Sequence, residues 1–406
     1  MQSTYWSTCP ILLLILSLSF FPKSLSTPLE TYEINLDLDP SVRYAGLFDL
    51  PNTNFNETVW KFYDDYFKDD EILTDVLYSI AEKRGKENEE QQAEIEGLAT
   101  MSKLPLPFVQ GIQMLYELQT IMVPIVNFTK SAIEASKLLP PEYKALSRIP
   151  WRGPGCTGII ARAADDTVYH ARNLDFSPVD IMGNLVYNGV FTRNGKEVFR
   201  SQMVAGYTMA ITGARFGDDG YAIERNTRYA DHKGGFEEMM KNLFSGRPLN
   251  GWSLRKVLET VDNYDSAVSE IQTMPYTSTE YCIISGVQKG RIISRNPDNV
   301  AHLQILDQPN YKERSDYIII TNFDYFWGDV REWFDPTGGN GMFHPRRIAA
   351  QKYLNSTVEG EITYDDLWNT INDKGVFADT IFQAIINVER GVWDVSQPDV
   401  LPESQK

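Results

Sequence analysis

One predicted β-hairpin constrains this chain more than any other segment. Residues 156–162 are predicted to form a strand, 164–166 a turn, and 167–172 the returning strand. Such a hairpin folds Arg172 and Asp175 back towards Cys156. A thiol becomes a useful nucleophile when a base takes its proton or nearby positive charge lowers its pKa. The hairpin therefore brings a candidate nucleophile, a cation and a carboxylate within reach of one another.

The first residues are predicted to be a secretory signal peptide. Residues 11–21 form an apolar run, and Ser24-Leu25-Ser26 is a small-x-small cleavage site. This run is too short to span a bilayer, and the chain has no later stretch of roughly 18 or more apolar residues. We expect residues 1–26 to be removed and the mature protein to be soluble.

Three sequons agree with passage through the secretory pathway. They begin at Asn56, Asn127 and Asn355. We expect glycosylation at these asparagines, in a protein that resides in the lysosome or is secreted.

The chain is strongly acidic, with a formal net charge of −17. This charge argues against nucleic-acid binding and against attraction to an anionic surface at neutral pH. An acidic lysosomal compartment fits the charge, because carboxylates begin to protonate near pH 5 and self-repulsion then falls. Composition does not separate this interpretation from simple solubility of a secreted protein.

The cysteines leave two interpretations open. Cys9 lies in the signal peptide, so the mature chain keeps Cys156 and Cys282. Two cysteines in an oxidising compartment usually form a disulfide. The alternative is that Cys156 stays free as a nucleophile and Cys282, within a buried-strand pattern, is a packed free thiol.

The chain divides into a helical N-terminal third and a mixed remainder. Apolar stripes at helical spacing run through residues 56–147, and the charge run at 82–96 is most simply a solvated helix or loop. The apolar helix pattern at 108–126 indicates core packing or a lipid-binding face. The remainder is predicted to hold strands at 158–163, 167–172, 185–191, 197–205, 280–285, 291–294, 301–305 and 316–322, helices at 236–244, 252–274, 346–354 and 364–372, and a last hairpin around Arg390-Gly391. This order predicts an α+β fold of sheets covered by helices.

Four ordered motifs stand at compatible spacing along the chain. They are YEINLDL at 32–38, CTGIIA with ARNLD within 156–175, ISG with VQKGRIISR at 284–295, and TNFD at 321–324 followed by PRR at 345–347. Together they resemble the family of acid ceramidase and N-acylethanolamine-hydrolysing acid amidase, which are N-terminal-nucleophile (Ntn) amidases. The resemblance is good from about residue 157 to 355 and weaker in the N-terminal third.

The resemblance implies a fold and a maturation step. The implied fold is the αββα sandwich of Ntn hydrolases, with an added helical N-terminal subunit. The precursor would cut itself between Gly155 and Cys156, giving a heterodimer of residues 27–155 and the catalytic residues 156–406. The family usually carries an apolar residue before its cysteine, whereas this chain has Gly155 after a long loop.

The resemblance also assigns roles to individual residues. Cys156 would be the nucleophile, and its freed α-amino group, with an unperturbed pKa of roughly 7.7–8.0, would carry the proton. Arg172 would orient the substrate carbonyl, Asp175 would hold the terminal ammonium, and Asn322 would donate to the oxyanion. Arg346 would support the others. No cofactor and no metal is implied, and the four histidines show no catalytic or metal-binding spacing.

The predicted function is hydrolysis of the amide bond of a lipid, with ceramide preferred. The alternatives are an N-acylethanolamine amidase, a relative acting on soluble amides, and a non-catalytic secreted lipid-binding protein with a Cys156–Cys282 disulfide. Expected partners are the lipid amide substrate and a sphingolipid activator protein or membrane surface, with no nucleic acid.

Overall fold

A computed structural model describes residues 27–126, 141, 144, 155–229, 235–308, 314–327, 346–376 and 379–398. The predicted signal peptide, the Asn127 sequon, most of the loop before Gly155 and the residue before Arg346 lie outside these ranges. Within them, no helix is both long and apolar enough to cross a membrane.

Two β-sheets form the centre of the molecule. One has six strands in the order β1 (Thr27–Pro28), β14 (Val392–Gln397), β13 (Thr380–Asn387), β4 (Val168–Asp175), β3 (Cys156–Arg162) and β12 (Tyr317–Ile320). The other has eight strands in the order β11 (Val300–Ile305), β10 (Lys289–Arg295), β9 (Glu280–Gly286), β8 (Tyr221–Thr227), β7 (Thr212–Arg215), β6 (Lys196–Val204), β5 (Val186–Arg193) and β2 (Thr31–Asn35).

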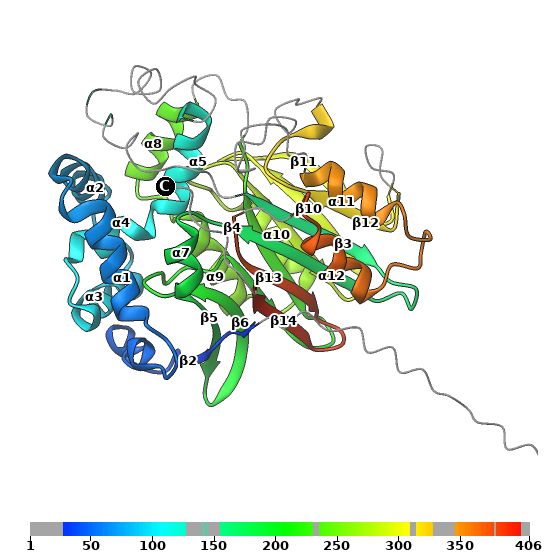
Figure 1. Cartoon of the computed structure of the whole chain (residues 1–406), viewed down its shortest axis with the longest axis horizontal. Helices are drawn as coiled ribbons and strands as arrows, with labels where there is room; N and C mark the ends of the chain where they lie inside the picture. The colour runs from blue at the N-terminus through cyan, green and yellow to red at the C-terminus, as the bar shows by residue number, and fades with distance from the viewer. Residues whose placement is uncertain are drawn as a thin grey trace, which may run out of the picture.

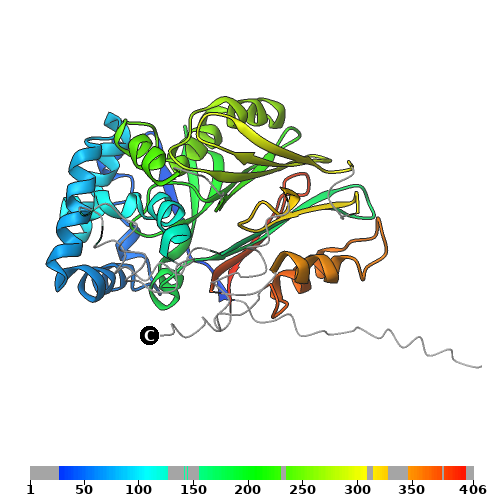
Figure 2. The same cartoon turned by 90° about the horizontal axis from the view of Figure 1, so that it is seen from above.

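Helices cover the outer faces of both sheets and form a further group at one end. The helices described are α1 (Phe55–Tyr63), α2 (Glu71–Arg84), α3 (Glu89–Ser102), α4 (Leu106–Gln113), α5 (Leu115–Val126), α7 (Val179–Met182), α8 (Gly235–Phe244), α9 (Asn250–Thr260), α10 (Tyr264–Thr273), α11 (Arg346–Leu354) and α12 (Tyr364–Asn372). Helices α11 and α12 contact the six-stranded sheet, whereas α9 and α10 contact the eight-stranded sheet. Figure 1 and Figure 2 show these layers, with α1 to α4 as a separate group at one end.

The central strands are apolar on both faces because both faces are covered. On β3, Ile159 packs in a cluster with α11 and α12, whereas its neighbour Ile160 packs between the sheets. On β12, Ile319 packs in the cluster with α11 and α12, and Ile318 packs in the cluster between the sheets. The layer order is therefore helix, sheet, sheet, helix, and the predicted αββα sandwich is confirmed.

The residues before Gly155 contribute strands as well as helices. Strand β2 pairs in parallel with β5, and β1 pairs with β14 at the edge of the other sheet. The N-terminal segment thus adds an edge strand to each sheet. The sequence predicts only helices in this segment. Helix α5 follows α4 in the chain and lies beside α8.

Most predicted elements are present, but strands β7 and β8 were missed in addition to β1 and β2. The hairpin turn at Asn194-Gly195 is confirmed, because both residues have the positive φ values, 51° and 68°, that a tight hairpin needs. Strands β7 and β8 escaped prediction because β7 has only four residues and β8 places charged side chains among its apolar ones.

The expectation of a wholly solvated charge run at 82–96 was wrong for Glu94. This residue of α3 is completely buried. Its Oε2 lies 2.5 Å from Arg255 Nη1 on α9, and its Oε1 lies 2.8 Å from Arg43 Nη1. Two buried guanidinium groups therefore share one carboxylate, which ties the N-terminal segment to the sandwich.

We expect Glu94→Ala to destabilise the protein by about 3–5 kcal/mol, because it removes the buried carboxylate that two buried cations share. Of the carboxylates in the described part of the chain, Arg43 then keeps only the half-exposed Glu90, and Arg255 keeps only Glu259. Glu89→Ala on the same helix is the matched control, since Glu89 is exposed, and it should cost less than about 1 kcal/mol. Denaturant unfolding of both variants measures the difference. Equal losses would mean that Glu94 contributes no more than an exposed carboxylate.

Candidate active site

Cys156 is the first residue of β3 and is completely buried. Strand β3 lies between β4 and β12, with Cys156 opposite Leu174 and Gly158 opposite Ile320. The chain beyond the end of β12 therefore passes beside Cys156. This register carries Asn322 to Cys156 from 166 positions away.

Asn322 holds the backbone nitrogen of Cys156. Its Oδ1 accepts from Cys156 N at 3.0 Å and from Arg346 Nη2 at 2.6 Å. Its Nδ2 donates to the Thr227 carbonyl at 2.8 Å. Two donors on one side and a carbonyl on the other fix the orientation of this amide. In this uncut chain the amide thus faces the Cys156 nitrogen through its oxygen, and its Nδ2 keeps a second hydrogen beyond the one given to Thr227.

Asp175 and Arg346 form a buried ion pair beside Asn322. Arg346 Nη1 lies 3.1 Å from Asp175 Oδ2, and Thr380 Oγ1 donates to Asp175 Oδ1 at 2.5 Å. The backbone N–H of Asp175 donates to the Gly155 carbonyl oxygen at 2.7 Å. That carbonyl belongs to the peptide bond predicted to be cut, so one donor already points at the oxygen that would become negative.

Arg172 lies next to the sulfur. Its Nη2 donates to Cys156 Sγ at 3.5 Å and to the Arg225 carbonyl at 3.2 Å. Its Nε lies 3.5 Å from Glu224 Oε1. The guanidinium is buried and held from several sides, so it cannot swing away from the thiol. The structure therefore brings all five predicted catalytic residues together: Cys156, Arg172, Asp175, Asn322 and Arg346.

The pKa of the Cys156 thiol is raised in this uncut chain. Burial is the largest cause, and the positive charge of Arg172 opposes it only in part. The neighbouring cation does lower this pKa, as expected, but its effect is smaller than that of burial. Loss of hydration disfavours the thiolate more than Arg172 favours it. The thiol stays protonated while its own nitrogen is still an amide.

His170 has a structural position, as its isolated place in the sequence indicated. One ring nitrogen lies 3.1 Å from Ser285 Oγ and the other 2.9 Å from Glu224 Oε2. Gly158 leaves the room that Glu224 needs, because a Cβ on residue 158 would lie 2.7 Å from Glu224 Oε1. In the described part of the chain, no cluster of three or more His, Cys, Asp or Glu residues could hold a metal ion.

Cys156 and Cys282 are both free thiols. Cys282 is buried, and its Sγ lies 3.2 Å from the hydroxyl of Tyr276. The prediction that Cys282 is a packed free thiol is confirmed. The structure does not contain the alternative Cys156–Cys282 disulfide.

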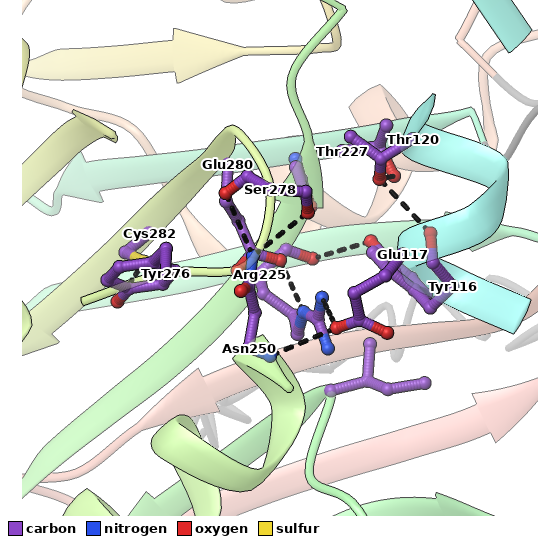
Figure 3. A network of polar contacts seen from close by, with 12 residues as sticks. Tyr116, Glu117, Thr120, Arg225, Thr227, Asn250, Tyr276, Ser278, Glu280 and Cys282 are labelled. Carbon is purple, nitrogen blue, oxygen red and sulfur yellow. Dashed lines mark hydrogen bonds and ion pairs between the residues drawn. The ribbon is translucent and has the colours of Figure 1, made fainter. Parts of the chain in front are cut away.

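A buried charged network next to the thiol was missed by the sequence analysis (Figure 3). Arg225 on β8 bonds to Glu280 through Nε and lies 2.9 Å from Glu117 Oε1 through Nη2. Glu117 Oε1 also accepts from the Asn250 backbone at 3.0 Å, at the first turn of α9. The feature of the sequence that could have indicated this network is Glu117, a lone carboxylate within the apolar run 108–126.

Asp324 is buried and follows Asn322 by two residues. Its carboxylate binds Arg228, with Nε at 2.7 Å, and Tyr281. It anchors the turn that carries Asn322.

No family model matches the chain. N-acylethanolamine-hydrolyzing acid amidase of Caenorhabditis elegans is 27% identical over 298 residues, covering 72% of this chain and 74% of that protein. Acid ceramidase of Heterocephalus glaber is 23% identical over 388 residues, covering 90% of this chain and 85% of that protein. The predicted resemblance to this family is confirmed. A solved structure of a Caenorhabditis elegans N-acylethanolamine-hydrolyzing acid amidase ortholog aligns with a TM-score of 0.48 at 25% identity, over 62% of this chain and 97% of that one.

The names of these two relatives, an N-acylethanolamine-hydrolyzing acid amidase and an acid ceramidase, support a hydrolase that acts on amides. The five residues that the family motifs assigned are the ones that converge on Cys156. Of the predicted glycosylation sites, Asn56 and Asn355 are exposed, and Asn127 lies outside the described residues.

The charged network should make stability depend on pH. Burial raises the pKa of Glu280 from its usual value near 4.5 to about 7, although Arg225 opposes the shift. The folded state then binds more protons than the unfolded state between these values, so stability falls as the pH rises through that window.

We expect Glu280→Gln to lose this part of the pH dependence, which amounts to about 3 kcal/mol at most. Unfolding by denaturant at pH 4.5, 5.5, 6.5 and 7.5 measures it as the difference from wild type. Glu270→Gln, at an exposed position of α10, is the control and should follow the wild-type profile. Parallel profiles for wild type and Glu280→Gln would contradict the expectation.

Proposed function

We propose that this protein is a lipid amidase that hydrolyses the N-acyl amide bond of ceramide with Cys156 as its nucleophile. The observation that carries the proposal is the set of contacts around one residue. The nitrogen of Cys156 is held by Asn322, its sulfur contacts Arg172, and the carbonyl before it accepts from the Asp175 backbone. These are the three groups that must be oriented for the chain to cut itself and then to cut an amide.

The proposed maturation is an attack of Cys156 on the bond before it. The sulfur loses its proton and adds to the Gly155 carbonyl carbon, while the Asp175 N–H stabilises the oxyanion. The C–N bond then breaks, the nitrogen takes a proton, and Gly155 is left as a thioester on Cys156. Water hydrolyses the thioester to give the Gly155 carboxylate, a free thiol and a free α-amino group.

The proposed catalytic cycle repeats this chemistry on a substrate amide. The α-amino group takes the thiol proton, the sulfur adds to the substrate carbonyl, and the leaving amine receives the proton. Water then releases the fatty acid from the acyl-enzyme. Arg172 contacts the sulfur and Asn322 contacts the Cys156 nitrogen, so both can donate to the substrate oxygen. The Asp175–Arg346 pair can hold the terminal ammonium.

Ceramide is the proposed substrate, and an N-acylethanolamine is the second candidate. The likeness to an acid ceramidase extends over 90% of this chain, which supports the first. The higher identity of 27% to an N-acylethanolamine-hydrolyzing acid amidase supports the second. We propose action in the lysosome or outside the cell, on a lipid presented by a membrane or an activator protein.

A pair of substrates with the same acyl chain tests the choice. Purified protein should release fatty acid at acid pH faster from the ceramide than from the N-acylethanolamine, at equal concentration in mixed micelles. The reverse order would make the second candidate the function. Release from neither would refute a lipid amidase.

We expect Cys156→Ala to give a single uncut chain without amidase activity, because it removes the sulfur that forms both thioesters. Cys282→Ala is the matched control, since this second buried thiol contacts Tyr276, and it should be cut and active. Gel analysis and N-terminal sequencing of the heavier product check the cut. A heavy chain that begins at another residue would contradict self-cleavage after Gly155.

We expect Asn322→Ala to lower kcat of the cut enzyme by about 10²–10³, because an amide that orients the nucleophile and can donate to the oxyanion is lost. Asn322→Asp should lower kcat at least as much, since an oxygen would then face the Thr227 carbonyl in place of Nδ2. Asn184→Ala, at an exposed site, is the control. Retention of more than roughly a third of wild-type kcat, far above that expected loss, would remove Asn322 from the mechanism.

A further inference from the structure

Tyr116 is a buried residue in contact with the sulfur of Cys156. It lies at the second position of α5, 40 residues before Cys156 in the chain. Its hydroxyl oxygen lies 3.8 Å from Cys156 Sγ and donates to the Arg225 carbonyl at 3.3 Å. A contact of 3.8 Å is within hydrogen-bonding range when one partner is sulfur. Figure 3 shows Tyr116 on α5 next to Arg225.

Two contacts fix the ring of Tyr116. The Arg225 guanidinium carbon lies 4.1 Å from the ring centroid, a cation–π contact. The ring of Phe176 is stacked on it, with centroids 6.1 Å apart and an interplanar angle of 13°. Phe176 follows Asp175 in the chain, so the catalytic strand itself supplies one of these contacts. The hydroxyl therefore cannot leave the sulfur without disturbing β4 or β8.

The helix that carries Tyr116 is also anchored. Its next residue, Glu117, binds Arg225 and caps α9 through Asn250, as described above. One turn later, Thr120 Oγ1 lies 3.4 Å from Thr227 Oγ1. Ahead of the helix, Gln113 donates to the Gly206 carbonyl at 2.7 Å. The contacts on α5 thus set its position around the thiol before any cut is made.

We propose that Tyr116 is a positioning residue for the Cys156 sulfur, supplied by the segment that the cut would separate from it. The inference rests on the proposed function and deepens it. The catalytic site would then contain a residue from each product of the cut, and the 27–155 product would be part of the working enzyme.

The hydroxyl of Tyr116 and the guanidinium of Arg172 donate to the same backbone carbonyl, and this suggests how Tyr116 acts. The Arg225 carbonyl accepts from Tyr116 and from Arg172 Nη2, and both donors also lie against Cys156 Sγ. Burial raises the pKa of the Tyr116 hydroxyl well above its usual value, so the hydroxyl keeps its proton. When the thiol ionises, that proton can turn from the carbonyl to the thiolate without movement of the ring. The hydroxyl would therefore favour the thiolate and fix its direction.

Tyr116→Phe tests the proposal because it removes only the hydroxyl. Tyr187→Phe is the matched control, since Tyr187 is also buried and its hydroxyl has no hydrogen-bond partner among the described residues. We expect Tyr116→Phe to lower kcat about 10-fold or more, with a smaller change in KM. The pH profile of Cys156 modification by methyl methanethiosulfonate should shift upward by about one pH unit, as followed by peptide mass spectrometry.

The control should match wild type in both measurements. Incorporation of 3-fluorotyrosine at position 116 keeps a hydroxyl and should restore activity, which a packing defect would not explain. An unchanged modification profile in folded Tyr116→Phe would overturn the proposal. The modification assay needs neither substrate nor turnover. A profile that shifts in a protein without amidase activity would therefore refute the proposed function and leave the role of Tyr116 intact.

Discussion

The site depends on one hydrogen bond, from the Cys156 nitrogen to the Asn322 side chain. This bond exists because β3 pairs with β12 on one side and with β4 on the other. The same pairing directs Asp175 and Arg172 towards the same residue. A shift of one residue in either register would turn these side chains to the opposite face of the sheet. The apolar residues on both faces of β3 and β12 therefore protect the register and, through it, the chemistry.

Buried charges connect the N-terminal segment to the rest of the molecule. Glu94 binds Arg255, Glu117 binds Arg225, and Arg84 donates to the Leu243 carbonyl at 2.7 Å. The two ion pairs are shielded from water, so removal of either carboxylate leaves a buried guanidinium with less compensating charge. A cut after Gly155 would break one peptide bond and leave these contacts and the strand pairings of β1 and β2. The two products have a physical reason to stay together.

The uncut chain combines a protonated thiol with an oriented carbonyl. Burial raises the pKa of Cys156 despite the adjacent Arg172, while the Gly155 carbonyl is already polarised by the Asp175 N–H. Release of an α-amino group at Cys156 would add a base beside the sulfur and a positive charge beside Asp175. The same residues can thus support two different protonation states of the Cys156 thiol, one before the cut and one after it.

The sequence by itself determined the elements and the members of the site. Turn residues such as Asn194-Gly195 and apolar runs such as 317–320 act over a few residues, so their patterns predicted strands and turns correctly. The motifs around Cys156 and Asn322 named the residues that converge. Only the tertiary structure decided that the thiol is buried with a raised pKa, that Glu94 and Glu280 are buried charges, and that Tyr116 touches the sulfur. These facts depend on which faces pack against each other across long separations, and local patterns of charge and hydrophobicity contain no record of that pairing.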